Sequence, residues 1–512
     1  MERSYRTAEG TAYLLSSKPY FDQGALCRKT CVAGLYIALI CNTVCLVAGV
    51  YTTLRPISFS WQGAGGEAIT VSFNIAITLL NEIYGYIHGI SLRWALQREG
   101  RLTFNSNLRL LTSSRTSRPN KWYTNLFMLC CIIGSYSSSS LVFLKDGSYE
   151  YDEETDDSPP THVCGAAIIS LAMCLLGQGI VAWWSLLNKL HVPTWSADPL
   201  DTVAACIQEG YLHQVSGRCM QSVHDAAAPS TPTLPRHKQR PAYAAHPEVR
   251  KVIWALWATV VLAILWAIII WAIIKDGSVN GISDGGNWSL FSNDDTPFLN
   301  MGWDVDSETL PAVCYIWAFF FISGLQAVIT LALHCVELRV NCITDEATWR
   351  LASSQGGLKR DRNILIKMGT SWPSITLLCF KPLVHWLYGL SITITFNAGV
   401  TMRPPQIFYL SASALLLALF ATTIVRMSPK GPQPATFGHL QTLANLIDEW
   451  PAEGKRLFWG HKSDQGDFAH AGTSSGKLGE INFQVGYLGI LWSRVPLGSL
   501  QHGDQWGRRR EC

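Results

Sequence analysis

The chain has 512 residues, of which 48% are hydrophobic and only 15% are charged, and its mean hydropathy is +0.16. A soluble globular protein carries about 25% charged residues, so this chain lacks the charge that a water-exposed surface needs. Twenty Trp and nineteen Phe exclude disorder for most of the length. A formal net charge of +3 is too small to indicate nucleic acid as a partner.

Eight apolar stretches are long enough to cross a bilayer, which takes roughly 20 apolar residues. In chain order they are Cys31–Leu54, Ile69–Leu92, Trp122–Leu144, Val163–Leu187, Val252–Ile274, Leu310–Leu333, Ser371–Thr395 and Ile407–Val425. Residues 1–30 are polar, and the run that follows them is too long for a signal peptide. We therefore expect an all-α, polytopic membrane protein without a cleaved signal.

The positive charges support this count independently, because Lys and Arg concentrate on cytoplasmic loops. If residues 1–30 are cytoplasmic, 35 of the 40 Lys and Arg fall on that side, in segments 1–30, 93–121, 188–251, 334–370 and 426–512. Each of the four loops on the other side holds one. The pattern predicts eight spans with both termini cytoplasmic, in the plasma membrane or an endomembrane.

One sequon, Asn287-Trp288-Ser289, lies in the largest of the predicted outer loops. Glycosylation is added to such loops in proteins that enter the secretory pathway. We therefore predict a glycan on Asn287.

Three pairs of similar segments recur in the same order along the chain. His88–Arg93 and His334–Arg339 both read His-x-x-x-Leu-Arg, and Arg109–Ser114 is similar to Arg350–Ser354. Segments 200–209 (LDTVAACIQE) and 440–449 (LQTLANLIDE) are identical at five of ten positions. The offsets are 246, 241 and 240 residues. This regularity predicts two tandem halves of four spans, which enter the membrane in the same direction as parallel repeats.

The predicted organisation has five parts. These are a cytoplasmic N-terminal segment (1–30), a first half with its cytoplasmic helix (31–210), a flexible Pro/Ala-rich linker (211–251), a second half with its cytoplasmic helix (252–450), and a cytoplasmic tail (451–512). Within the tail, the Gly/Ser/His-rich stretch 460–480 is expected to be irregular.

Ionisable groups at membrane depth are costly unless they are paired, which makes them functional candidates. The second span holds Asn81, Glu82 and His88, and the seventh holds Lys381 and His385. Glu82 and Lys381 have opposite charges and lie near the middle of their spans. They could form a buried ion pair that joins the halves and exchanges a proton or a cation. Two structural interpretations stay open, a purely structural pair or a Lys381 that extends to the membrane surface.

Prolines and glycines mark the same two spans. Pro373 and Pro382 remove backbone donors from the seventh span, and breaks of this kind often line a cavity. Gly85-x-x-x-Gly89 in the second span is typical of close approach between helix backbones. No metal or cofactor motif is recognisable, so we expect neither a metal site nor a cofactor.

Segments 200–209 and 440–449 place apolar residues at helical spacing after Pro-rich entries. They predict short amphipathic helices, either on the membrane surface or capping the bundle. A docking role, for a cytosolic partner or for the other half, is the alternative.

The segments PTWSADPLDT after the fourth span, and PATFGHLQTLANLIDEW, LFWGHK and HAGTS after the eighth, resemble a group of large multi-pass proteins of filamentous fungi. The resemblance covers roughly residues 25–490, and the last twenty residues depart from it. No biochemical activity is assigned to that group, so the resemblance implies a membrane location and little else.

These features favour transport or sensing of a small solute between the two halves, rather than an enzyme. One alternative is an intramembrane enzyme on a lipophilic ligand, with Glu82 as the acid and Asn81 or His88 assisting. The other is a membrane scaffold that acts through its cytoplasmic helices.

Overall fold

The computed structural model describes twelve stretches of the chain. They are residues 25–59, 64–146, 161–187, 191–245, 247–277, 282–283, 286–292, 296–302, 312–359, 371–396, 399–451 and 455–489. Most of the predicted N-terminal segment 1–30 and the end of the tail lie outside the described residues.

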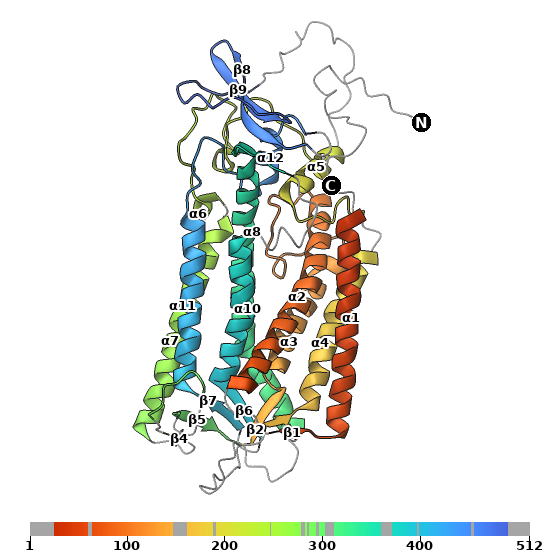
Figure 1. Ribbon diagram of the computed structural model, residues 1–512, viewed down its shortest axis with the longest axis vertical. Coiled ribbons are helices and arrows are strands. Elements are labelled where there is room, and N and C mark those ends of the chain that lie inside the picture. Colours follow the sequence, from red (N-terminus) through yellow and green to blue (C-terminus); the bar gives the residue numbers. More distant parts are fainter. Residues whose placement is uncertain are drawn as a thin grey trace, which may run out of the picture.

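Eight long helices run side by side along the described part of the chain (Figure 1). They are α1 (Ala25–Leu54), α2 (Ala64–Arg98), α3 (Trp122–Ser139), α4 (Gly165–Leu187), α7 (Pro247–Asp276), α8 (Ala312–Arg350), α10 (Trp372–Ser391) and α11 (Pro404–Arg426). Each overlaps one of the predicted spans. In Figure 1, α1 and α4 form one edge of the bundle, α7 and α11 form the other, and the remaining four lie between them.

Six helices in the described residues are long and apolar enough to cross a membrane: α1, α2, α4, α7, α8 and α11. This is compatible with a multi-pass membrane protein. Helices α3 and α10, with 18 and 20 residues, fall outside that set because their polar side chains make them less apolar than the other six. At 1.5 Å per residue α3 extends about 27 Å, slightly less than the hydrocarbon core.

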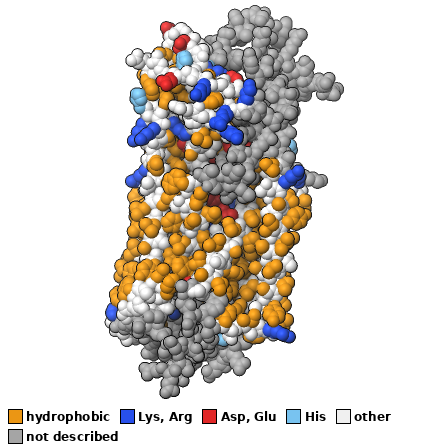
Figure 2. Space-filling model, viewed as in Figure 1, with side chains coloured by type: hydrophobic (Ala, Val, Ile, Leu, Met, Phe, Trp, Pro, Cys, Tyr) orange, Lys and Arg blue, Asp and Glu red, His pale blue; other side chains and the backbone are white. Residues whose placement is uncertain are grey.

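Apolar side chains cover most of the face of the helical region that Figure 2 shows. Ile37 and Ile40 on α1, Leu262 on α7 and Phe320 on α8 are all at least half exposed. In Figure 2, Lys and Arg side chains gather mainly at the two ends of this apolar band. A continuous apolar surface of this size is suited to lipid rather than water.

Several helix ends differ from the predicted spans, and three of them bear on the architecture. Helix α8 continues to Arg350, well past the predicted end at Leu333, because a polar helical surface can follow an apolar one without a Pro or Gly to stop it. Helices α3 and α10 end early, at Ser139 and Ser391. Each is followed by a short β-strand at the same end of the bundle.

The expectation of an all-α fold is therefore incomplete, because a seven-stranded sheet closes one end of the bundle. Its strands, in chain order, are β1 (Ser58–Phe59), β2 (Phe143–Asp146), β3 (Thr161–Val163), β4 (Ile282–Ser283), β5 (Phe298–Met301), β6 (Ile392–Phe396) and β7 (Gly399–Met402). The sheet order is β1-β3-β2-β6-β7-β5-β4. All pairs are antiparallel except β2 with β6, which joins the two predicted halves in parallel.

The opposite end of the bundle carries a polar-surfaced unit that we call the head, residues 191–245 and 427–489. It contains α5 (Pro199–Gln208), α6 (Ala242–Ala245), α12 (Leu440–Leu446), and the hairpin β8 (Phe458–Gln465) and β9 (Phe468–Ser474). Helices α5 and α12 lie in the two similar segments 200–209 and 440–449, and they pack against each other. Leu200 and Val203 of α5 and Leu443 of α12 belong to one buried cluster.

The hairpin is a correction, since the composition of 460–480 predicted irregular chain. Asp448 holds the hairpin by accepting hydrogen bonds from His470 Nε2 (2.8 Å) and Lys462 Nζ (3.1 Å). Burial alone would raise the pKa of Asp448, but His470 and Lys462 outweigh it and lower the pKa. These contacts join residues that are far apart in the sequence, so local composition does not predict them.

The two resemblance motifs pack on α2 and α8. Trp94 Nε1, near the end of α2, donates to Thr194 O in PTWSADP (2.8 Å). Trp349 Nε1, near the end of α8, donates to Pro434 O, which precedes ATFGH (3.1 Å). The motifs therefore attach the head to the second helix of each predicted half.

The predicted linker, 211–251, has fixed partners in the structure. Thr233 N and O bond with Tyr487, and Gln239 N donates to Pro429 O (2.8 Å). Up to Pro241 the linker therefore crosses the head as mostly irregular chain held by hydrogen bonds, and it ends in α6 and the start of α7.

Glu346 of α8 offers a test of this attachment. Its Oε2 accepts from the backbone N–H of Thr436 (2.7 Å) and Phe437 (2.9 Å). We expect Glu346→Gln to destabilise the head by about 1–3 kcal/mol, because an amide can leave these buried donors unsatisfied. Chemical denaturation in detergent measures the change, and Glu480→Gln, at an exposed site, is the control. Equal stability of both variants would contradict the role of Glu346.

Candidate functional site

Lys381 is the centre of the candidate site and lies on α10. This helix begins at Trp372 after Ser371, and Pro373 occupies its first turn, where no backbone donor is needed. Pro382 lies inside the helix, which nevertheless continues to Ser391. The predicted break of the seventh span is therefore absent, and α10 carries Lys381 as part of one helix.

The Lys381 ammonium is held between two carboxylates from two other helices. Its Nζ donates to Glu82 Oε1 on α2 and to Glu337 Oε2 on α8, the latter at 3.1 Å. Lys381 itself is 5% exposed. The structure thus brings together Glu82 and Lys381, the two charges that the sequence singled out. We call Glu82, Glu337 and Lys381 the ion cluster.

A buried polar network continues from the ion cluster along α2 and α3. Asn81 receives a hydrogen bond from Gln178 Nε2 of α4 (2.9 Å) and donates to Ser135 Oγ of α3 (3.2 Å). One turn of α2 further, Thr78 Oγ1 accepts from Tyr136 OH (3.2 Å). The polar side chains of α2 therefore meet α3 and α4 on one face.

His385 lies on the same side of α10 as Lys381, one turn along. Its ring stacks on Tyr136, with centroids 3.5 Å apart and planes at 8°. His385 Nδ1 donates to Gln326 Oε1 of α8 (2.9 Å). The stacking connects the α2–α3 network to α10.

His88 has a different set of neighbours. It is fully buried, and it lies beside Arg109, Asn125 and the backbone of Pro119. Of the five predicted site residues, Asn81, Glu82, Lys381 and His385 thus belong to one connected region, whereas His88 packs against the 107–125 segment.

Arg109 comes from the segment between α2 and α3 and lies over α2. A Cβ on Gly85 would be 2.7 Å from Arg109 Nη2, and one on Gly89 would be 3.3 Å from Arg109 Cδ. The Gly85-x-x-x-Gly89 spacing was predicted to admit another helix backbone. In the structure it makes room for this guanidinium instead.

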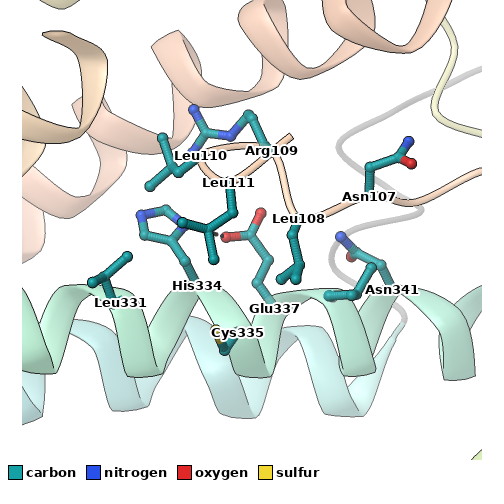
Figure 3. Close-up of a pocket in the computed structure, with 11 residues that line it drawn as sticks. Asn107, Leu108, Arg109, Leu110, Leu111, Leu331, His334, Cys335, Glu337 and Asn341 are labelled. Carbon is teal, nitrogen blue, oxygen red and sulfur yellow. Dashed lines mark hydrogen bonds and ion pairs between the residues drawn. The ribbon is translucent and has the colours of Figure 1, made fainter. Parts of the chain in front are cut away.

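A hollow lies between residues 107–111 and α8 (Figure 3). Its polar lining includes Arg109, His334 and Glu337, and the carboxylate of Glu337 points from α8 toward the 107–111 segment. His334 Nδ1 donates to Glu337 Oε2 (3.0 Å). Glu337 is therefore shared between the ion cluster and the hollow.

Sequence reasoning missed Glu337 and Arg109. Glu337 lies beyond the predicted end of the sixth span, although the absence of Pro and Gly between His334 and Arg350 could have indicated a continuing helix. Arg109 was placed in a cytoplasmic loop. We find no local signal that this loop would return to α2.

The Arg109 segment is anchored by Glu99, the residue after α2. Glu99 Oε1 accepts from Ser114 Oγ (2.6 Å) and from the backbone N–H of Arg115 (2.6 Å) and Thr116 (2.9 Å). Burial alone would raise the pKa of Glu99, but these hydrogen bonds outweigh it and lower the pKa to about 2. The carboxylate thus stays ionised and fixes the loop.

Two other expectations concern groups outside this region. Asn287 Oδ1 accepts from the backbone N–H of Ser289 (2.8 Å), and glycosylation at Asn287 stays a prediction. Across the described ranges, no group of three or more His, Cys, Asp or Glu side chains is placed to hold a metal ion.

No family model, no curated protein and no solved structure matches the chain. The resemblance to fungal multi-pass proteins therefore stays a prediction. The chain is a mostly helical protein with six helices in its described part apolar enough to cross a membrane. Its candidate site is a charged region where α2, α8 and α10 meet.

We expect Lys381→Met to destabilise the protein by about 3–5 kcal/mol, because Glu82 and Glu337 would keep their charges without the ammonium. Adding Glu82→Gln and Glu337→Gln should restore most of this loss, since the three charges are then removed together. Thermal and chemical unfolding in detergent measure both effects. The control Lys251→Met removes an ammonium whose side chain is 74% exposed. A Lys381→Met protein as stable as this control would contradict the pairing.

Glu99 makes the stability of the fold depend on pH in the acidic range. Its folded pKa of about 2 lies below the unfolded value of about 4.3, so its stabilisation is complete above the unfolded pKa. That stabilisation is lost as the pH falls from about 4.3 to about 2. We expect Glu99→Gln to be less stable at pH 7 and to lose less stability across this window than the wild type. Unfolding temperatures against pH test this, and parallel curves would contradict it.

Proposed function

We propose that all eight long helices cross the membrane as two parallel four-helix halves, with the head in the cytoplasm. The helix contacts support this repeat, because α1 packs on α4 as α7 packs on α11. Between the halves, α2 contacts α10 and α3 contacts α8, which are equivalent pairs under the repeat. Six of the helices are independently apolar enough to span.

The sheet supports the same symmetry. From the central pair outward, β2 and β3 on one side correspond to β6 and β7 on the other. If a two-fold axis lies between two neighbouring strands and points along them, the rotation exchanges the strands without reversing their direction. The two strands are then parallel, as β2 and β6 are. Such an axis would run along the membrane normal, as parallel repeats require.

We infer that the protein transports or senses a small solute at the ion cluster, where the two halves meet. One observation carries this proposal: Lys381 of the second half is paired with Glu82 of the first and with Glu337. An ionised triad between helices of different halves is a contact whose strength changes when a carboxylate gains a proton. A change in that contact would alter how the halves pack.

The two alternative functions receive less support. An intramembrane enzyme needs its acid to face the pocket that takes the ligand, whereas Glu82 is not among the residues that line the hollow beside the ion cluster. A scaffold acting through segments 200–209 and 440–449 needs their apolar faces exposed, whereas α5 and α12 bury those faces against each other. Solute transport or sensing requires only what the ion cluster provides, a charged contact between the two predicted halves.

Proton exchange at Glu82 is the step that a flux experiment can detect. The full chain is reconstituted into liposomes with an entrapped pH dye, and a potassium gradient with valinomycin sets an inside-negative potential. We expect inward proton flux above that of empty liposomes, and a loss of at least tenfold in Glu82→Gln, because an amide cannot release a proton.

The control for this flux is Glu248→Gln, which removes a carboxylate paired with Lys251 at the head end of α7. It should retain wild-type flux. Wild-type flux equal to empty liposomes, or a well-folded Glu82→Gln protein with undiminished flux, would contradict the proposal.

A further inference from the structure

Two arginines from different helices meet at the head end of the bundle edge that α7 and α11 form. Helix α6 packs there against both helices (Figure 1). Arg250 lies in the first turn of α7, and Arg426 is the last residue of α11. Their guanidinium carbons both lie over the ring of Tyr243 in α6, 5.6 and 5.8 Å from its centroid. These cation–π contacts hold two positive charges around one aromatic ring.

The two guanidinium groups are not neutralised by an acidic side chain. Among the described residues, no carboxylate forms an ion pair with Arg250 or Arg426, and both side chains are exposed. The carboxylate of Glu248, in the same turn of α7, is paired with Lys251 at 3.2 Å. Two like charges held at one ring repel each other, and an anion bound between them would offset that repulsion. The arginine pair is therefore suited to an anion from outside the chain.

The surface next to the arginine pair is apolar on both helices. Trp254 lies one turn after Arg250 on the same face of α7 and is 72% exposed. Exposed Trp side chains of this kind are enriched at the boundary between membrane and water. The exposed apolar side chains that lead further along the bundle are Val261, Leu265 and Ile268 on α7, and Leu416 and Leu419 on α11. Charge, interfacial ring and apolar rows thus follow one another in the order of a phospholipid, from phosphate to acyl chains.

We propose that this edge binds an anionic glycerophospholipid of the membrane leaflet next to the head. Its phosphate pairs with Arg250 and Arg426, and its acyl chains lie along the apolar faces of α7 and α11. Guanidinium groups match phosphate oxygens in geometry, and basic residues beside a membrane attract anionic lipids. A soluble phosphate ester would make the charged contact but leave the apolar rows uncovered. The inference goes beyond the proposed function and uses only its placement of the helices in a membrane.

Native mass spectrometry of the detergent-purified full chain measures lipid binding directly. Phosphatidylserine and phosphatidylcholine with identical acyl chains are titrated, and the apparent dissociation constants of the first bound lipid are compared. We expect phosphatidylserine to bind at least fivefold more tightly, because phosphatidylcholine carries no net negative charge. Inorganic phosphate and glycerophosphoserine, which have no acyl chains, should compete at least tenfold more weakly than phosphatidylserine itself.

Two double variants with the same loss of charge assign the binding to this edge. Arg250→Gln with Arg426→Gln should weaken phosphatidylserine binding at least tenfold. Arg28→Gln with Lys29→Gln removes two exposed cations from the head end of α1, at the other edge of the bundle, and should leave the binding within about twofold. Trp254→Ser keeps both arginines and should weaken the binding at least threefold, so it serves as the second test if the first double variant fails to fold.

Equal binding of the two lipids would overturn the inference. An equal loss of binding in both double variants would overturn it too, because that loss would come from the general surface charge. Inorganic phosphate that competes as strongly as phosphatidylserine would replace the lipid with a soluble anion. The measurement does not depend on proton flux. Intact flux without the preference for phosphatidylserine therefore removes this inference alone, and the preference without Glu82-dependent flux removes the proposed transport alone.

Discussion

The arrangement of the bundle depends on the need to keep the Lys381 ammonium paired away from water. An isolated buried charge costs several kcal/mol, and the carboxylates that offset it come from α2 and α8. Three helices are thereby held at one level. Asn81 and Tyr136 add α3 and α4 through hydrogen bonds and ring stacking. The β2–β6 pair and the α5–α12 contact hold the same interface at the two ends of the bundle.

Much of the helical architecture could be predicted from the sequence, because a membrane span needs a long apolar run and little else. The eight helices lie where such runs occur. The ends of the helices were harder to predict. Helix α8 continues to Arg350 because its polar part packs on the head, and β2 and β6 form because they pair with each other across the chain. The hairpin at 458–474 depends on Asp448, a contact that composition does not report. For the strands and the hairpin, the missing information was a tertiary contact rather than a local preference.

The candidate site was likewise predictable only in part. Glu82 and Lys381 could be identified because charges are rare inside apolar runs, and their opposite signs suggested the contact that the structure contains. Glu337 was missed because it follows the apolar run, and Arg109 because a loop brings it back to α2. Gly85 and Gly89 were recognised as a place of close approach, but the approaching group could not be inferred from one helix. The sequence thus indicated the charges that interrupt an apolar run, Glu82 and Lys381. The structure added Glu337 and Arg109, which tertiary folding brings next to them.

The central claim is that Glu82 and Lys381 stabilise the interface between the two predicted halves as a pair. A double-mutant cycle on unfolding free energy in detergent, with Glu82→Gln, Lys381→Met and the double variant, measures this coupling directly. We predict a favourable interaction of about 1–3 kcal/mol, so that the double variant is more stable than the sum of the single losses implies. Additive losses, equal within about 0.5 kcal/mol, would contradict the claim.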